Sequence, residues 1–232
     1  MQNPKDDFVL VLGSKPNSFI PNLSVKRIYS ANGAAERAEI YRKKFNNVKA
    51  ISVVSDSVFN KLSEVRDRVV NLNPDIIYCR YGEINKKLID IKPEIINKTR
   101  FSQLLWQSKF FKNGIFQLLI SELYYEDSIL KKLRHLYDCL RWRGFLSSST
   151  GLYAILLALE ENPNSKIIIS GIGINSGGET FYGSNKEKVN RHRVDKKLFF
   201  KLKPNFTEKL ITCDFEMHSL CSIPLWKGDR ID

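Results

Sequence analysis

The sequence lacks the long apolar run of a membrane-spanning helix, and its few cysteines are scattered. No stretch reaches the roughly 18 uninterrupted apolar residues that such a helix needs. The polar start, residues 1–7, lacks the apolar core of a signal peptide. The four cysteines form no Cys-x-x-Cys pair, and no His/Cys/Asp/Glu cluster has metal-ligand spacing. We therefore expect free thiols, no metal site and a cytoplasmic protein.

The glycine-containing stretches also lack the signatures of common cofactor sites. Residues 13–16 have no second Gly followed by Lys and Ser/Thr, which a P-loop requires. Gly171 and Gly173 are not followed by a third glycine at dinucleotide spacing, and no Gly-x-Ser-x-Gly elbow is present. ATP, NAD and Ser-His-Asp hydrolysis therefore have no support in the sequence.

Positive charge, by contrast, is abundant. The chain has 37 Lys and Arg residues against 25 Asp and Glu residues, for a net charge of +12. This excess favours anionic partners. Aromatic and basic residues do not interleave as in RNA-binding surfaces, and no recognition-helix motif occurs, so we expect no specific nucleic-acid partner.

Apolar runs and helical patterns alternate along both ends of the chain, which predicts a parallel sheet with flanking helices. We therefore expect a Rossmann-like α/β fold in a single domain, residues 1–232. A stretch rich in aromatic residues and helical patterns, about 81–146, predicts a helical insert or lid. The expected strands are 8–12, 24–30, 50–54, 75–79, 166–170 and 210–213. The expected helices are 34–44, 58–71, 101–111, 115–125, 129–140, one over the apolar run 152–159 and one that begins near His192, with Val194, Leu198 and Leu202 on its apolar face.

Ligands of open α/β sheets bind beyond the carboxyl ends of the strands. Gly13 and Ser14 follow the first strand directly, although an ordinary surface turn would have the same pattern. Hydroxyl residues 147–150 precede the apolar helix, and the free N–H groups of a helix N-terminus attract anions. These two places are the candidate ligand site.

His192 is the most interesting of three histidines. Asp195 follows it by three residues on a predicted helix, where a carboxylate could orient the imidazole and raise its basicity. An exposed histidine within a basic helix is the alternative. His135 and His218 have no comparable neighbours in the sequence.

The order of landmarks resembles the bacterial sialyltransferases of glycosyltransferase family 42 and, more loosely, related Kdo transferases. Residues 13–18 are similar to the family's Gly-x-x-Pro-Ser nucleotide loop, and Asn32 to its asparagine that contacts the nucleotide-sugar. Ser55 stands where the family usually has asparagine. Residues 148–153 and 168–172 resemble its Thr-Ser-Gly helix and its strand ending in Ser-Gly-Ile-Asp, with Gly173 in place of the aspartate.

The resemblance implies a sheet of the GT-A-variant type and transfer of an acidic sugar, sialic acid or Kdo, from a CMP-sugar to a cell-surface glycan. It implies no metal and no cofactor besides the donor. The acceptor would be lipopolysaccharide, lipooligosaccharide or capsule, with peripheral contact at the inner membrane surface. His192 falls near the family's general base, and Tyr182 near a tyrosine that binds the donor. The implied site residues are His192 and Asp195 for catalysis, and Gly13, Ser14, Asn32, Ser55, Ser149, Thr150, Gly151, Gly171 and Tyr182 for the substrate.

Two alternatives stay open from the sequence. Some Kdo-transferring relatives retain configuration and need a carboxylate nucleophile, for which Asp56 and Glu83 are candidates. A non-enzymatic basic α/β module that binds anionic polysaccharide or nucleic acid would also explain the charge.

Overall fold

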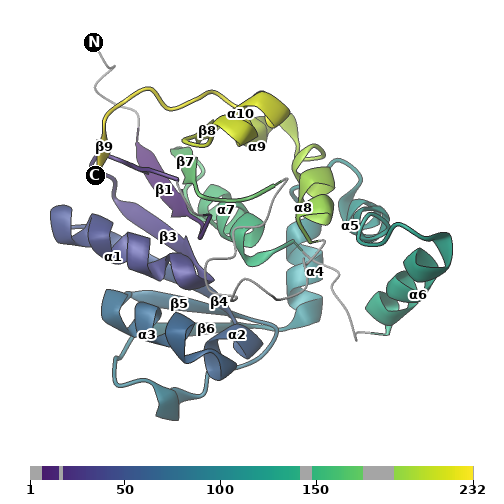
Figure 1. Ribbon diagram of the computed structural model, residues 1–232, viewed down its shortest axis with the longest axis horizontal. Coiled ribbons are helices and arrows are strands. Elements are labelled where there is room, and N and C mark those ends of the chain that lie inside the picture. The colour runs from purple at the N-terminus through teal and green to yellow at the C-terminus, as the bar shows by residue number, and fades with distance from the viewer. Residues whose placement is uncertain (1–6, 16–17, 142–147, 175–190, 232) are drawn as a thin grey trace.

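In the computed structural model, which describes residues 7–15, 18–141, 148–174 and 191–231, helices enclose a central sheet (Figure 1). The sheet has seven strands in the order β6-β5-β4-β3-β1-β7-β8, and each neighbouring pair is parallel. The expected α/β class is therefore confirmed. The strands are β1 (Phe8–Leu12), β3 (Arg27–Ala31), β4 (Lys49–Ser55), β5 (Ile76–Arg80), β6 (Glu94–Lys98), β7 (Lys166–Ser170) and β8 (Leu210–Thr212), while β2 (Ile20–Pro21) pairs antiparallel with β9 (Arg230–Ile231).

Both faces of the sheet are covered, which explains why the central strand β1 is apolar at every position. Along β1, Val9 and Val11 point to one hydrophobic core, and Leu10 and Leu12 to the other. The first core lies under α7 (Thr150–Glu161), and the second lies under α1 (Ala35–Lys44) and α3 (Ser63–Leu72). Figure 1 shows α7 on the side of the sheet opposite α1.

Helix α7 is the most deeply buried helix in the described part of the chain, as its apolar sequence predicts. Every residue from Leu152 to Leu159 is buried. Each Leu or Ile side chain removed from water in this way contributes about 1.5–3 kcal/mol. The helix is therefore fixed firmly, and with it the position of its N-terminus at the carboxyl edge of the sheet.

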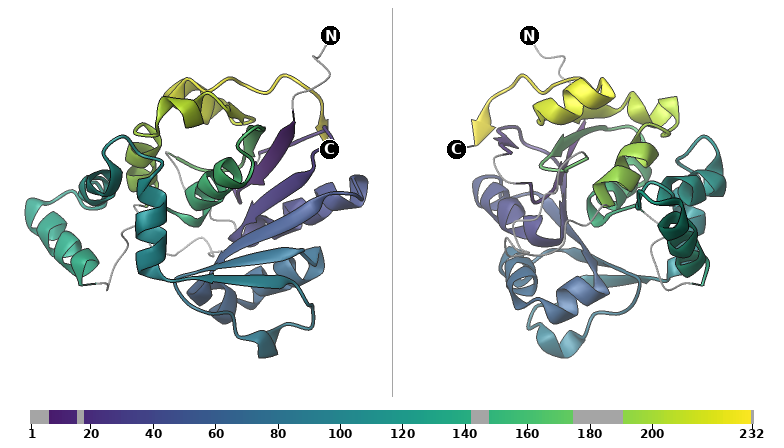
Figure 2. Two further views of the ribbon diagram at one scale, coloured as in Figure 1. Left: turned by 180° about the vertical axis from the view of Figure 1, so that it is seen from behind. Right: turned by 45° about the vertical axis from the view of Figure 1, so that its right-hand side comes forward.

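The stretch expected to be wholly helical also contains a strand. β6 lies at the edge of the sheet and pairs only with β5 among the described strands. Its burial is partial, and its apolar run is limited to Ile95 and Ile96, so no strong strand signal arises. After it come α4 (Arg100–Ser108), α5 (Gly114–Glu122) and α6 (Ile129–Leu140), and the last two extend away from the sheet (Figure 2).

Two further differences concern the helix after β4 and the chain after β8. The helix expected over 58–71 is two helices, α2 (Asp56–Lys61) and α3, because Leu62 is extended between them. The chain after β8 forms a helix, α10 (Phe215–Cys221), and strand β9, where the sequence shows no clear pattern.

No helix in the described ranges is long and apolar enough to cross a bilayer. The remaining helices are α8 (Arg191–Phe199), α9 (Pro204–Thr207), η1 (Asn32–Ala34) and η2 (Lys86–Leu88).

Candidate functional site

Strands β1 and β7 are neighbours in the sheet, and the chain adds its later strands on opposite sides of this pair. From β1 the chain proceeds outward through β3, β4 and β5 to β6, whereas β7 and β8 lie on the other side. Such a switch point is where open α/β sheets bind ligands. The two loops beyond it are joined: Gly13 N–H donates to Ser170 O at 2.8 Å, and Lys15 N–H donates to Gly171 O at 2.9 Å.

The two loops approach so closely that glycine is required at both positions. A Cβ atom on Gly13 would lie 2.6 Å from the carbonyl carbon of Gly171. Gly171 has φ +76°, and its Cβ would lie 2.7 Å from Gly13 O. Gly13 and Gly171 therefore shape the floor of the switch point together.

Arg37 of α1 and Asp214, which precedes α10, hold these two loops through hydrogen bonds. Arg37 Nη1 donates to Gly13 O at 2.7 Å, and Nη2 donates to Ser170 Oγ at 3.0 Å. Asp214 Oδ2 accepts from Gly171 N–H at 2.8 Å. Burial raises the pKa of Asp214 and lowers that of Arg37, while each charge counteracts the shift of the other. Neither residue was expected from the sequence, although an acid directly after a predicted strand was a usable signal.

The N-terminus of α7 meets helix α8 directly. Ser149 caps α7, because its Oγ accepts from Leu152 N–H at 3.3 Å. Ser149 N–H donates to Asp195 Oδ1 of α8 at 2.9 Å. The N–H groups of Thr150 and Gly151 precede the first hydrogen bonds within the helix, so the positive end of its dipole faces the carboxyl edge of the sheet.

Arg80 is a buried cation beside this helix terminus. It ends β5 and is only 1% exposed. Its Nη2 donates to Ser148 O at 2.8 Å, its Nη1 to Thr150 Oγ1 at 3.3 Å and its Nε to Gln103 Oε1 at 3.1 Å. The guanidinium and the helix dipole both favour an anion at this place. Arg80 was not expected from the sequence, although a basic residue directly after a predicted apolar strand was a usable signal.

Asn32 and Ser55 lie together at the ends of β3 and β4. Asn32 has φ +48°, and its Oδ1 accepts from Ser55 N–H at 3.3 Å. Ser55 Oγ caps α2 by accepting from Val58 N–H. Asp56 follows at the start of α2 and faces Gly82, whereas Glu83 is exposed.

His192 and Asp195 point to different surroundings. Asp195 is buried against Ser149, and burial raises its pKa while Arg191 opposes the rise. His192 is half-buried and borders a hollow of about 370 Å³. Within the described ranges the two side chains share no hydrogen bond, so the expected orientation of the imidazole by Asp195 stays a prediction, as does its role as a base. The hollow is lined by Tyr124, Glu126, Asp127, Lys132, His192, Arg193, Lys196 and Lys197.

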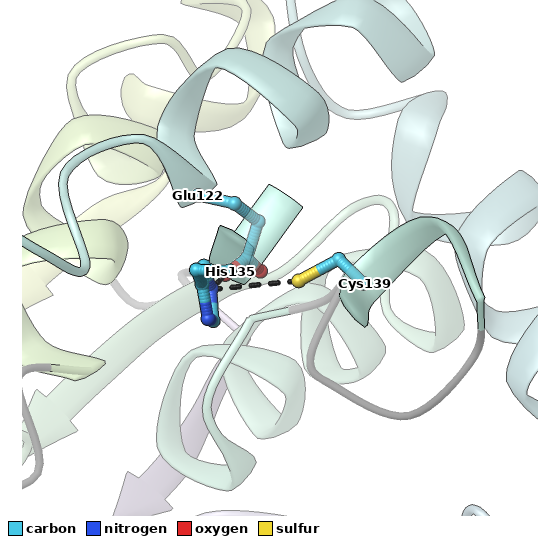
Figure 3. Close-up of side chains that lie close together, drawn as sticks. All are labelled: Glu122, His135 and Cys139. Atoms are coloured by element: carbon cyan, nitrogen blue, oxygen red, sulfur yellow. Dashed lines mark hydrogen bonds and ion pairs between the residues drawn. The ribbon is translucent and has the colours of Figure 1, made fainter. Parts of the chain in front are cut away.

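A second cluster, at the junction of α5, α6 and α8, was not expected from sequence. His135 Nε2 lies 2.9 Å from Glu122 Oε2 and 3.4 Å from Cys139 Sγ (Figure 3). The three ligand-type atoms lie within 4.8 Å of one another, as metal ligands can. Arg191 Nη1, however, is 2.8 Å from both oxygens of Glu122 and already balances its charge. We therefore interpret this cluster as a structural junction; the spacing of His135 and Cys139, four residues apart, was its only sequence signal.

Most of the predicted substrate residues lie at one edge of the sheet. They follow β1, β3, β4 and β7 or begin α7, whereas His192 lies on the neighbouring α8. Tyr182 lies outside the described residues. The residues at this edge are Gly13, Ser14, Asn32, Ser55, Ser149, Thr150, Gly151 and Gly171.

Comparison of the chain with protein-family models, with curated proteins and with solved structures found no match.

Proposed function

We propose that this chain is a glycosyltransferase that moves an acidic sugar, sialic acid or Kdo, from a CMP-activated donor to a cell-surface glycan. One observation carries the proposal. Eight of the nine residues that the family resemblance assigns to the nucleotide-sugar follow strands or begin α7 at the carboxyl edge of a parallel sheet, where the buried cation Arg80 binds Thr150.

The single phosphate of a CMP-sugar matches this arrangement chemically. As the bond to the sugar breaks, negative charge grows on the departing phosphate. Arg80 and the N-terminus of α7 are fixed before the reaction and would stabilise that charge in a site with little water. We assign the neutralisation of the leaving group to these groups.

The transfer itself needs a base near the acceptor. The acceptor hydroxyl would attack the anomeric carbon, the bond to phosphate would break, and its electron pair would leave with CMP. The imidazole of His192 would take the hydroxyl proton. Asp195 supports this assignment indirectly, because its bond to Ser149 holds α8, and therefore the hollow beside His192, against the end of α7.

The proposal predicts CMP release that depends on Arg80. We expect the protein to release CMP from CMP-Neu5Ac or CMP-Kdo, measured by chromatography with a glycan acceptor and with water alone. Arg80→Met should lower the rate about 10²- to 10³-fold, the usual cost of removing one donor to a developing anion. Arg80→Lys keeps the charge and should recover part of the rate, while thermal melting verifies that both variants fold. If the wild-type protein releases CMP from neither donor, the proposed activity is wrong.

A further inference from the structure

Helix α6 presents an apolar face to solvent. Five large apolar side chains recur at a spacing that places them on one side of this helix. Isolated exposed apolar residues are common on proteins, but a continuous stripe marks an interaction site. The exposed fractions are 75% for Ile129, 79% for Leu130, 59% for Leu133, 52% for Tyr137 and 55% for Leu140.

The orientation of α6 is fixed by the polar side of the helix. Cys139 is buried and His135 is half-buried, and both face Glu122 of α5. Arg191 of α8 binds the same carboxylate. The helix therefore turns His135 and Cys139 inward and its apolar stripe outward, whereas an ordinary surface helix buries its apolar face. It lies at the end of the molecule farthest from α1, where a flat surface can reach it (Figures 1 and 2).

Basic residues accompany the apolar face. Lys131 and Arg134 are exposed on α6, and Arg141 follows directly, with its guanidinium 4.7 Å from the centroid of the Tyr137 ring. Long basic side chains of this kind keep their charge at the level of lipid headgroups while apolar neighbours enter the layer below. Anionic lipids attract such residues.

We propose that α6 binds flat on an anionic lipid bilayer, with Ile129, Leu130 and Leu133 in the interfacial layer. A second copy of the chain is a poorer occupant. A symmetric pair of α6 helices would cover this stripe and bring Arg134 and Arg141, which flank it, toward the same residues of the other copy, and these like charges repel.

The docking rests on α6 alone. The link between docking and the glycan acceptor rests on the proposed function. Lys132 of the same helix and His192 line one hollow, so a docked protein would hold this hollow near lipid-linked glycans. Loss of docking with retained CMP release would separate the two proposals.

The test is co-sedimentation with vesicles made of equal parts phosphatidylglycerol and phosphatidylethanolamine, compared with phosphatidylcholine alone. The wild-type protein should bind the anionic vesicles, and added salt should weaken the binding. The pair Leu130→Glu and Leu133→Glu should weaken it at least about tenfold, and the pair Lys131→Glu and Arg134→Glu should weaken it on anionic vesicles.

The matched control is Ile40→Glu on α1, where the exposed isoleucine (46%) lies far from α6 and its loss should leave vesicle binding unchanged. Thermal melting shows whether each variant folds. Absence of vesicle binding by the wild type, or equal binding by the Leu130/Leu133 variant, overturns the proposal. Sedimentation velocity supplies the other refuting outcome: a wild-type dimer that the Leu130/Leu133 substitutions convert to monomers would make this face a contact between copies.

Discussion

Replacing His192 by alanine should lower the rate of sugar transfer about 10²- to 10⁴-fold, the range that general-base catalysis contributes. Binding of the nucleotide should stay unchanged, because His192 borders the hollow by α8, and the described hydrogen bonds of Gly13, Gly171 and Arg80 do not involve it. Steady-state kinetics of the variant, together with CMP titration, measures the two effects separately.

The control for this prediction is another histidine outside the candidate site. Nδ1 of His218, in α10, donates a hydrogen bond to Ile223 O at 2.6 Å. His218→Asn keeps a side-chain donor at this position. Its transfer rate should stay within a few-fold of the wild-type value. Undiminished turnover of His192→Ala would contradict the base assignment and favour a mechanism with a carboxylate nucleophile, for which Asp56 lies at the edge of the sheet.

Gly13→Ala should have the largest effect on stability. The new methyl group would overlap the backbone of Gly171 and crowd Ile172 Cγ1, 2.8 Å away. Backbone cannot move aside as a flexible side chain can, so the loops after β1 and β7 must separate. We expect a loss of about 3 kcal/mol in the free energy of unfolding and loss of CMP binding, measured by urea denaturation and nucleotide titration.

Gly151→Ala is the matched control for this change. Its Cβ would meet Ile172 Cγ2 at 3.2 Å, a side-chain contact that can adjust. Alanine also favours a helix over glycine by about 1 kcal/mol, which offsets the crowding. We therefore expect little change in stability. Equal stability of Gly13→Ala and Gly151→Ala would show that the close approach of the two loops is not a constraint.

The sheet could be predicted from sequence where its strands are buried on both faces. β1 is an uninterrupted apolar run and β7 contains three successive isoleucines, and the bounds of α6, Ile129–Leu140, follow directly from its period. Strand β6 was not predicted, because an edge strand has one partner and needs fewer apolar residues. The break at Leu62 escaped because a single extended residue leaves the helical spacing of its neighbours almost unchanged.

The site could be predicted only where its chemistry is local. A glycine that follows a strand and a hydroxyl residue that begins an apolar helix stand out in the sequence, as Gly13 and Thr150 do. Arg80 and Arg37 act through residues distant in the chain, since Arg80 binds Ser148 and Arg37 binds Ser170. Such contacts arise from the fold, and no spacing rule contains them.

The central claim is that the carboxyl edge of the sheet binds a cytidine nucleotide, and CMP titration by thermal shift tests it most directly. At a CMP concentration about 100-fold above Kd, binding should stabilise the fold by about 2.7 kcal/mol. That corresponds to a rise in melting temperature of about 5–10 °C. AMP and a generic polyanion such as heparin should give no comparable rise. A shift with heparin or nucleic acid but none with any cytidine nucleotide would contradict the account and favour a basic module that binds polyanions.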